Sequence, residues 1–311
     1  MDGPKLRIGL ALGSGVARGW AHLGVLNALA ALGIVPDVVA GTSIGALVGG
    51  AWVAGKQAEL TDWAHAQGNR MWRHLDFRLS GGGLIGGQRF ADSMGEAFGG
   101  VTIESLDRPF AAVATDLATG HEVWLREGSL IDAIRASYAM PGIFTPVERD
   151  GRLLVDGALV NPVPVSVCRA LGAHLVIAVN LNADVFGKSS VQGGETEARQ
   201  TILEPGSGIR PQAVLMRQLF TGSRRSPSMF AVMAGALNIM QDRLSRSRLA
   251  GDPADVLIAP RLGHVGILDF HRTDEIIAEG ERAFAEARTQ LEDALSVMTF
   301  GRREAGLLNW S

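Results

Sequence analysis

The sequence predicts an α/β protein, a three-layer α/β/α sandwich with a mostly parallel central sheet. Strand-like apolar runs alternate with stretches of helical periodicity, which is typical of a parallel sheet covered by helices on both faces. The first two expected strands each lead through a glycine-rich turn into a helix. A chain of 311 residues with 47% hydrophobic residues can bury a large core, which excludes a disordered protein. The expected strands cover residues 6–12, 38–40, 110–114, 153–155 and 175–179.

The first expected strand ends in a glycine loop, after which apolar residues recur at helical spacing. Such a loop points unpaired N–H groups outward, so it suits either a phosphate cradle or an oxyanion hole. The dinucleotide fingerprint requires glycine where Arg18 stands and an acidic residue after the second strand, which is missing. We therefore favour an oxyanion hole, with the Gly15 and Val16 N–H groups as donors and Arg18 orienting the loop. The loop residues are Gly13-Ser14-Gly15-Val16-Ala17-Arg18-Gly19.

The second expected strand ends in Gly41-Thr42-Ser43-Ile44-Gly45, and a helix rich in small residues follows. Strand, Gly-x-Ser-x-Gly and helix in this order are typical of a nucleophile elbow. The tight turn projects the Ser43 hydroxyl from the end of the sheet, and Gly41 and Gly45 keep Cβ atoms away from a strained backbone. The simpler alternative is a glycine-rich turn in which Ser43 caps the helix. We favour Ser43 as a nucleophile.

A serine nucleophile needs a base within hydrogen-bond reach. His264 and His271 fit the Ser–acid–His order of an α/β-hydrolase, but neither follows a clear strand, and Ser43 comes after only two strands. Asp156 ends an expected strand beside Gly157, so it can approach another strand end without crowding. An Asp-Gly pair can also simply form a hairpin turn. The other such pair, at residues 150–151, has the spacing of a hairpin and is expected to form that turn. We therefore assign the role of base to Asp156.

These three blocks, 13–19, 41–45 and 156–158, resemble in order those of the patatin-like phospholipase family. The whole length is similar to its bacterial branch related to neuropathy target esterase. The resemblance implies a patatin-like sandwich in which Ser43 and Asp156 form a Ser–Asp dyad and residues 13–19 form the oxyanion hole. It also implies hydrolysis of phospholipid or lysophospholipid acyl esters, with no metal or cofactor. Ser14, Arg18 and Ala158 depart from the family's frequent Gly, Lys and Gly, but they keep small residues and the positive charge.

Other activities stay open at this point. A thioesterase or a polyester depolymerase would use the same dyad on another acyl carrier, and the sequence does not separate these enzymes from a phospholipase. A nucleotide-binding module is a second class, although the glycine fingerprint is out of register. A non-catalytic lipid-binding protein with the same fold is a third.

Net charge and cysteine content narrow the possible classes of function further. A net charge of −3 without a basic patch argues against nucleic-acid binding. A single cysteine, Cys168, excludes a disulfide framework, and its apolar neighbours predict a buried thiol. No signal pattern opens the chain, and no apolar run reaches membrane-spanning length. We expect a cytoplasmic protein whose contact with a membrane, at its inner face, is peripheral.

We expect one domain made of three consecutive segments. Residues 6–182 form the patatin-like catalytic core, in which Asn161 caps the following helix or holds the loop of Asp156. Residues 183–228, polar and punctuated by glycine, are expected to form a mobile loop or lid. Residues 229–311 form a helical extension packed on the core. The methionine-rich apolar face over 229–244 is typical of a core helix, and it is also compatible with an acyl pocket or a homodimer contact.

Overall fold

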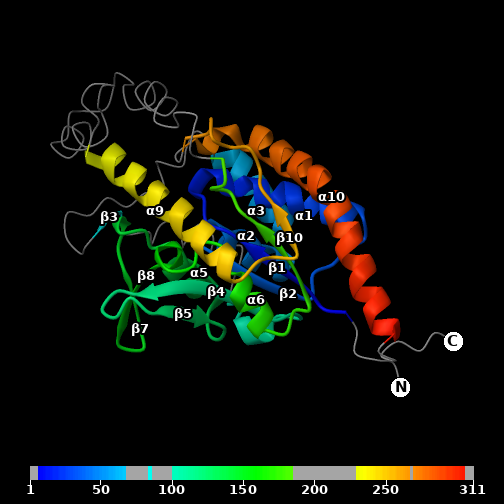
Figure 1. Ribbon diagram of the computed structural model, residues 1–311. Helices are drawn as coiled ribbons and strands as arrows, with labels where there is room; N and C mark the ends of the chain where they lie inside the picture. The colour runs from blue at the N-terminus through cyan, green and yellow to red at the C-terminus, as the bar shows by residue number, and fades with distance from the viewer. Residues whose placement is uncertain (1–5, 68–82, 86–99, 185–228, 267–268, 305–311) are drawn as a thin grey trace.

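The computed structural model describes residues 6–67, 83–85, 100–184, 229–266 and 269–304 (Figure 1). Almost all of the lid expected over 183–228 lies outside these residues. The described chain forms a central sheet between two layers of helices, with the glycine loop and the Gly-x-Ser-x-Gly turn at one edge of the sheet. The expected three-layer α/β/α architecture is confirmed.

The described part of the central sheet has eight strands, in the order β10-β9-β1-β2-β4-β8-β7, with β5 paired to β4. The block from β10 to β4 is parallel, whereas β5, β7 and β8 pair antiparallel. The mostly parallel sheet is therefore confirmed for the half that carries both glycine-rich turns. The strands are β1 (Ile8–Leu12), β2 (Val38–Thr42), β4 (Phe110–Asp116), β5 (Glu122–Leu125), β7 (Val147–Arg149), β8 (Arg152–Asp156), β9 (Leu175–Val179) and β10 (Val256–Ile258); β3 (Gly83–Ile85) and β6 (Gly142–Phe144) form a separate pair.

Helices cover both faces of the sheet (Figure 1). One face carries α1 (Ala21–Ala31), α2 (Ile44–Val53), α3 (Gln57–Gln67), α5 (Leu130–Ser137) and α10 (Thr273–Glu304). The other carries α6 (Val165–Ala170) and the C-terminal end of α9 (Met229–Gly251). Short 3₁₀ turns connect several elements: η1 (Val16–Trp20), η3 (Ile103–Ser105), η4 (Gly157–Leu159) and η5 (Phe270–Arg272).

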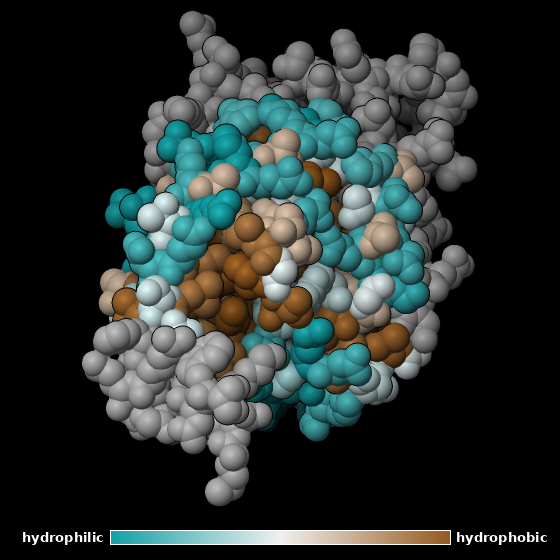
Figure 2. All heavy atoms as spheres, turned by 90° about the vertical axis from the view of Figure 1, so that its right-hand side faces the viewer, coloured by the Kyte–Doolittle hydropathy of each residue, from teal (hydrophilic) through white to brown (hydrophobic). Residues whose placement is uncertain are grey.

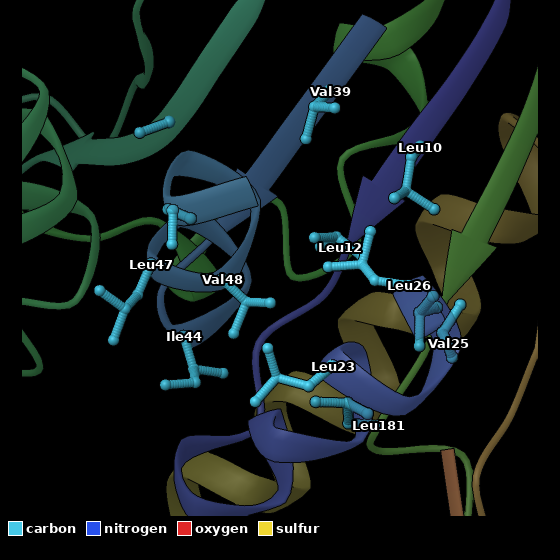
Figure 3. Close-up of a cluster of buried hydrophobic side chains, with 14 of the residues drawn as sticks. Leu10, Leu12, Leu23, Val25, Leu26, Val39, Ile44, Leu47, Val48 and Leu181 are labelled. Carbon is cyan, nitrogen blue, oxygen red and sulfur yellow. The ribbon is translucent and has the colours of Figure 1, made fainter. Parts of the chain in front are cut away.

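Alternation along the strands divides the core into two clusters. Leu10, Leu12 and Val39 point toward α1 and α2, where they meet leucine and valine side chains (Figure 3). Their neighbours Ala11 and Ala40 point to the opposite face, where α6 packs with the buried Cys168. Large side chains thus fill one face and mostly small ones the other, as the period of two in a β-strand requires.

The C-terminal segment adds more than helices to the core. Between its helices α9 and α10 lies β10, which pairs with β9 in parallel. The described part of this segment therefore adds one strand to the central sheet. The expected hairpin is also present: β7 and β8 pair across Asp150 and Gly151, whose φ angles of 52° and 73° suit a two-residue turn.

The side of the molecule that carries α1 and α10 is not uniformly polar. Figure 2 shows hydrophobic side chains gathered in a hollow among hydrophilic ones on this side. Leu32 and Val35, in the turn after α1, and Val297 in α10 are exposed. Single exposed apolar residues such as these three are common on protein surfaces.

Candidate active site

Ser43 occupies a strained turn between β2 and α2. Its φ and ψ are 58° and −122°, a positive φ that a non-glycine residue adopts only at a cost. The neighbouring glycine is required for space, because a Cβ on Gly45 would lie 2.1 Å from the Leu12 carbonyl oxygen. A Cβ on Gly41 would lie 2.4 Å from the Gly45 carbonyl oxygen. The turn thus has the strand-turn-helix geometry of a nucleophile elbow.

The carboxylate of Asp156 is the hydrogen-bond partner of the Ser43 hydroxyl. The hydroxyl donates to Asp156 Oδ2 over 2.7 Å, and both residues are buried. Asp156 ends β8 opposite Ala114 of β4, which brings it to the edge where β2 ends. Its other oxygen, Oδ1, accepts from the Ala158 N–H at 2.8 Å and caps η4. One oxygen therefore orients the carboxylate, and the other faces the serine.

Burial raises the pKa of Asp156 from 3.8 to about 6, although its hydrogen bonds from the Ala158 N–H and the Ser43 hydroxyl oppose this rise. At neutral pH the carboxylate is therefore ionised, but it holds its proton more tightly than an exposed aspartate does. A pKa near the working pH suits a group that must take a proton and later return it. Asp156 is therefore a candidate general base.

The glycine loop leaves three N–H groups without an acceptor among the described residues. Gly13 donates to the Val179 carbonyl at 3.0 Å and Ser14 to the Pro162 carbonyl at 2.9 Å, so these two N–H groups are occupied. No such bond is found within the described chain for the N–H groups of Gly15, Val16 and Ala17. Val16 has a φ of 52°, a strained value for a β-branched residue. Free N–H groups on a strained loop are able to bind an oxyanion.

Three contacts hold this loop beside the elbow. A Cβ on Gly19 would lie 2.0 Å from Ile44 Cγ1, so only glycine allows the loop to approach the residue after the nucleophile this closely. Arg18 is buried, and its Nε donates to the Val265 carbonyl at 3.0 Å. His22 Nε2 lies 2.8 Å from the Gly13 carbonyl oxygen. Burial lowers the pKa of His22 to about 4, so the neutral ring donates this bond at neutral pH.

Burial also lowers the pKa of Arg18, to about 10, while the charge of Asp269 opposes the change. Arg18 therefore stays charged at neutral pH. Through its bond to the Val265 carbonyl it links the glycine loop to the segment that follows β10, and its loop-orienting role stays a prediction.

Asn161 joins the loop of Asp156 to the strand that carries the elbow. Its carbonyl accepts from the Thr42 hydroxyl at 2.8 Å, and its side-chain N–H groups donate to Glu122 and Ser166. The N-cap position of α6 is held by Pro164, so Asn161 does not cap that helix. The other role expected for Asn161, holding the loop of Asp156, stays a prediction. Gly157 lets the loop of Asp156 approach β4 closely, since a Cβ there would lie 2.2 Å from the Val113 carbonyl oxygen.

Ser137 is a site residue that the sequence analysis missed. Its hydroxyl accepts from the Ser43 N–H at 2.8 Å and donates to the Val113 carbonyl at 2.6 Å. It is the last residue of α5 and is fully buried. A signal for it exists, because it continues the buried stripe of Leu130, Ala133 and Ile134 with a polar residue. Polar groups on such a face need a partner, and here the partner is the nucleophile's backbone.

We expect Ser137→Ala to slow catalysis about tenfold to a hundredfold and to destabilise the fold by about 1–3 kcal/mol, because it leaves the buried Ser43 N–H unpaired. Steady-state kinetics on a soluble acyl ester and thermal unfolding measure both effects. Ser129→Ala is the matched control at the other end of α5, where Ser129 caps the helix. It should cost about 1 kcal/mol of stability and leave kcat unchanged. Equal kcat losses for both variants would contradict the assigned role.

The histidines do not complete a triad in the part of the chain that the structure describes. His264 pairs with Glu275 at 2.9 Å and is exposed, and His271 is exposed in η5. The Ser43 hydroxyl and the Asp156 carboxylate make no hydrogen bond to a described histidine. Burial raises the pKa of Cys168 to about 12, which keeps the thiol protonated. The described residues also contain no group of side chains arranged to bind a metal.

None of the described helices is both long enough and apolar enough to span a bilayer.

Comparisons with known proteins identify the family of the chain. Residues 10–169, about half of the chain, match the Patatin-like phospholipase family. An uncharacterized NTE family protein of Mycobacterium tuberculosis is 35% identical over 332 residues, which cover 92% of each chain. Patatin-like phospholipase domain-containing protein 7 of Mus musculus is 34% identical over 183 residues, 57% of this chain and 14% of that protein.

The fold is also found in a solved structure. VipD from Legionella pneumophila superposes with a TM-score of 0.55 at 13% identity, covering 94% of this chain and 67% of that one. At this identity the likeness concerns the fold alone. The matched segment contains both Ser43 and Asp156, and the mycobacterial relatives extend the match over nearly the whole chain. The chain therefore belongs to the patatin-like phospholipase family, together with relatives named NTE family proteins, and this membership implies lipid acyl hydrolase activity.

Proposed function

We propose that this protein is a serine acyl-ester hydrolase that uses a Ser43–Asp156 dyad on phospholipid or lysophospholipid acyl esters. One observation carries the proposal: the Ser43 hydroxyl donates to Asp156 Oδ2 over 2.7 Å from a backbone held at a φ of 58°. A buried serine in a merely structural turn has no need of both a strained backbone and a carboxylate partner. The family and the names of the relatives support lipid acyl esters as the substrate class.

The first half of the reaction forms an acyl-enzyme. Ser43 Oγ attacks the acyl carbonyl carbon while its proton passes to Asp156 Oδ2. The carbonyl oxygen becomes an oxyanion, for which the unoccupied N–H groups of Gly15 and Val16 are the proposed donors. When the tetrahedral intermediate collapses, the ester bond breaks and Asp156 returns the proton to the leaving alcohol. The products are an acylated Ser43 and the deacylated lipid.

The second half releases the fatty acid by the same steps. A water molecule gives its proton to Asp156 and attacks the acyl-serine carbonyl, and the same donors stabilise the second oxyanion. Asp156 then protonates Ser43 Oγ as the acyl bond breaks. Each turnover consumes one water and regenerates the ionised carboxylate. Its raised pKa favours both directions of proton transfer near neutral pH.

We expect the purified protein to release fatty acid from phosphatidylcholine or lysophosphatidylcholine and to keep this activity in EDTA. The proposed dyad and backbone donors need no cation, and the described residues hold no cluster suited to one. Acyl-CoA and a short polyester belong in the same panel, measured as released acid. A clear preference for either would replace the phospholipase assignment with a thioesterase or a depolymerase. Strict dependence on calcium would contradict the dyad mechanism.

A further inference from the structure

Helix α9 buries polar side chains and exposes apolar ones. Its buried side chains include the polar residues Gln241, Asp242 and Ser245, whereas Val232, Ile239 and Met240 are 55%, 50% and 52% exposed. A surface helix of a soluble protein normally has the opposite arrangement, with apolar residues turned to the core. The methionine-rich face that would usually predict a core helix therefore lies on the surface. Its exposure needs an explanation outside the described fold.

The exposed residues form one continuous stripe. Residues at intervals of three or four lie on the same side of a helix. Along α9 this places Val232, Ala236, Ile239 and Arg243 in one row, and Met233 and Met240 beside it. We call these six residues the α9 stripe. Arg243 is exposed and makes no ion pair or hydrogen bond with a described residue, so the stripe ends in a free positive charge.

The buried side of α9 contacts the proposed oxyanion loop. The Ser14 hydroxyl donates to Gln241 Oε1 at 3.1 Å, and Asn182 Nδ2 lies 3.4 Å from the same oxygen. At the N-terminal end, Met233, which is only 36% exposed and lies at the margin of the stripe, also contacts β6, since a Cβ on Gly142 would lie 2.4 Å from its Cε. A surface bound to the α9 stripe would thus be separated from the glycine loop by the thickness of one helix, about 10 Å.

We propose that the α9 stripe docks on an anionic lipid surface. An apolar row that ends in arginine is the pattern of a helix lying at the headgroup layer, with its apolar side chains in the acyl boundary. Arg243 then meets lipid phosphates, whereas the neighbouring Arg246 is already paired with Asp242. This inference rests on the proposed function, because it supplies the surface from which an acyl ester would reach Ser43.

A second copy of this chain is a poorer occupant of the same stripe. The row contains no acidic side chain, so a symmetric contact would bury the Arg243 guanidinium against apolar residues without a partner. Four large exposed side chains also offer little area beside the ~800 Å² per partner of a stable protein interface. Lipid phosphates supply the missing charge, and the acyl region supplies the apolar surface.

The test measures binding to vesicles without hydrolysis, using full-length protein that carries Ser43→Ala. Vesicles of phosphatidylcholine are compared with vesicles that also contain phosphatidylglycerol, by co-sedimentation. We expect Val232→Ser with Ile239→Ser to lower the partition coefficient about tenfold or more on both. Arg243→Gln should lower it about fivefold on the anionic vesicles only. Val297→Ser is the matched control, a 70% exposed valine on α10, and should bind as the parent does.

Unchanged vesicle binding by the stripe variants would overturn the proposal. A dimer seen by light scattering and lost in the same variants, with vesicle binding unchanged, would assign the stripe to a second copy instead. With Ser43 intact, the stripe variants should hydrolyse a soluble short-chain ester at the wild-type rate. Because binding is measured on Ser43→Ala protein, docking without lipid hydrolysis by the wild type would refute the proposed function alone.

Discussion

Ser43→Ala is expected to abolish acyl-ester hydrolysis, with a loss of about a thousandfold or more in kcat, and to leave the fold intact. The variant removes the atom that attacks the acyl carbonyl, whereas the glycine loop and Asp156 stay in place. The side chain fills no large volume, so its loss creates no cavity of consequence. Release of a chromophore from a soluble acyl ester measures the rate, and circular dichroism verifies the fold.

Two kinds of control make this result specific. Ser105→Ala changes an exposed serine at η3, whose hydroxyl bonds only locally, and should leave the rate unchanged. His264→Ala and His271→Ala should each stay within about tenfold of wild type, since neither histidine bonds to the dyad. A wild-type rate for Ser43→Ala, or a histidine variant as inactive as it, would refute the assignment.

Local patterns in the sequence predicted most of the fold and pointed to Ser43 and Asp156, which the structure places 2.7 Å apart; their catalytic role stays a prediction. Apolar runs placed β1, β2, β4 and β9 nearly at their observed bounds, because buried parallel strands need continuous apolar residues, and a shorter apolar run placed the antiparallel β8. The glycines on either side of Ser43 marked it as a candidate nucleophile. In the structure Gly45 lies so close to the Leu12 carbonyl that no side chain fits there. Two Asp-Gly pairs lie close together in the sequence. We assigned the hairpin turn to Asp150 and Gly151, which form it in the structure, and this left Asp156 as the candidate base.

The features that escaped prediction depend on contacts between distant parts of the chain. Ser137 supports Ser43 from 94 residues away, and Gln241 reaches Ser14 across 227 residues. A single polar residue carries no information about such a partner until the strands between them are placed. β10 was missed for a related reason, since three residues between two long helices give too short a run to recognise as a strand.

Asp156→Asn is the second large effect, and we expect it to lower kcat by several orders of magnitude. The amide has the shape of the carboxylate but does not take the Ser43 proton, so the nucleophile loses its base. In the wild type, kcat/KM should fall below pH about 6 with a slope of one, because protonated Asp156 is no longer a base. A wild-type profile that stays flat to pH 4 would contradict this role.

The same substitution should stabilise the protein at neutral pH, because the ionised carboxylate is buried at a cost. The pKa of Asp156 is about 6 in the fold in place of 3.8, so folding favours the neutral form. The cost is therefore absent below pH about 4, grows as the pH rises to about 6, and is complete above it. At 1.36 kcal/mol per pKa unit it reaches about 3 kcal/mol. Denaturant unfolding should show Asp156→Asn more stable than wild type by up to that amount at pH 7.5 and nearly equal to it at pH 4. Asp150→Asn, the same change at an exposed hairpin turn, should show no such pH dependence. A stability difference that is the same at both pH values would contradict the raised pKa of Asp156.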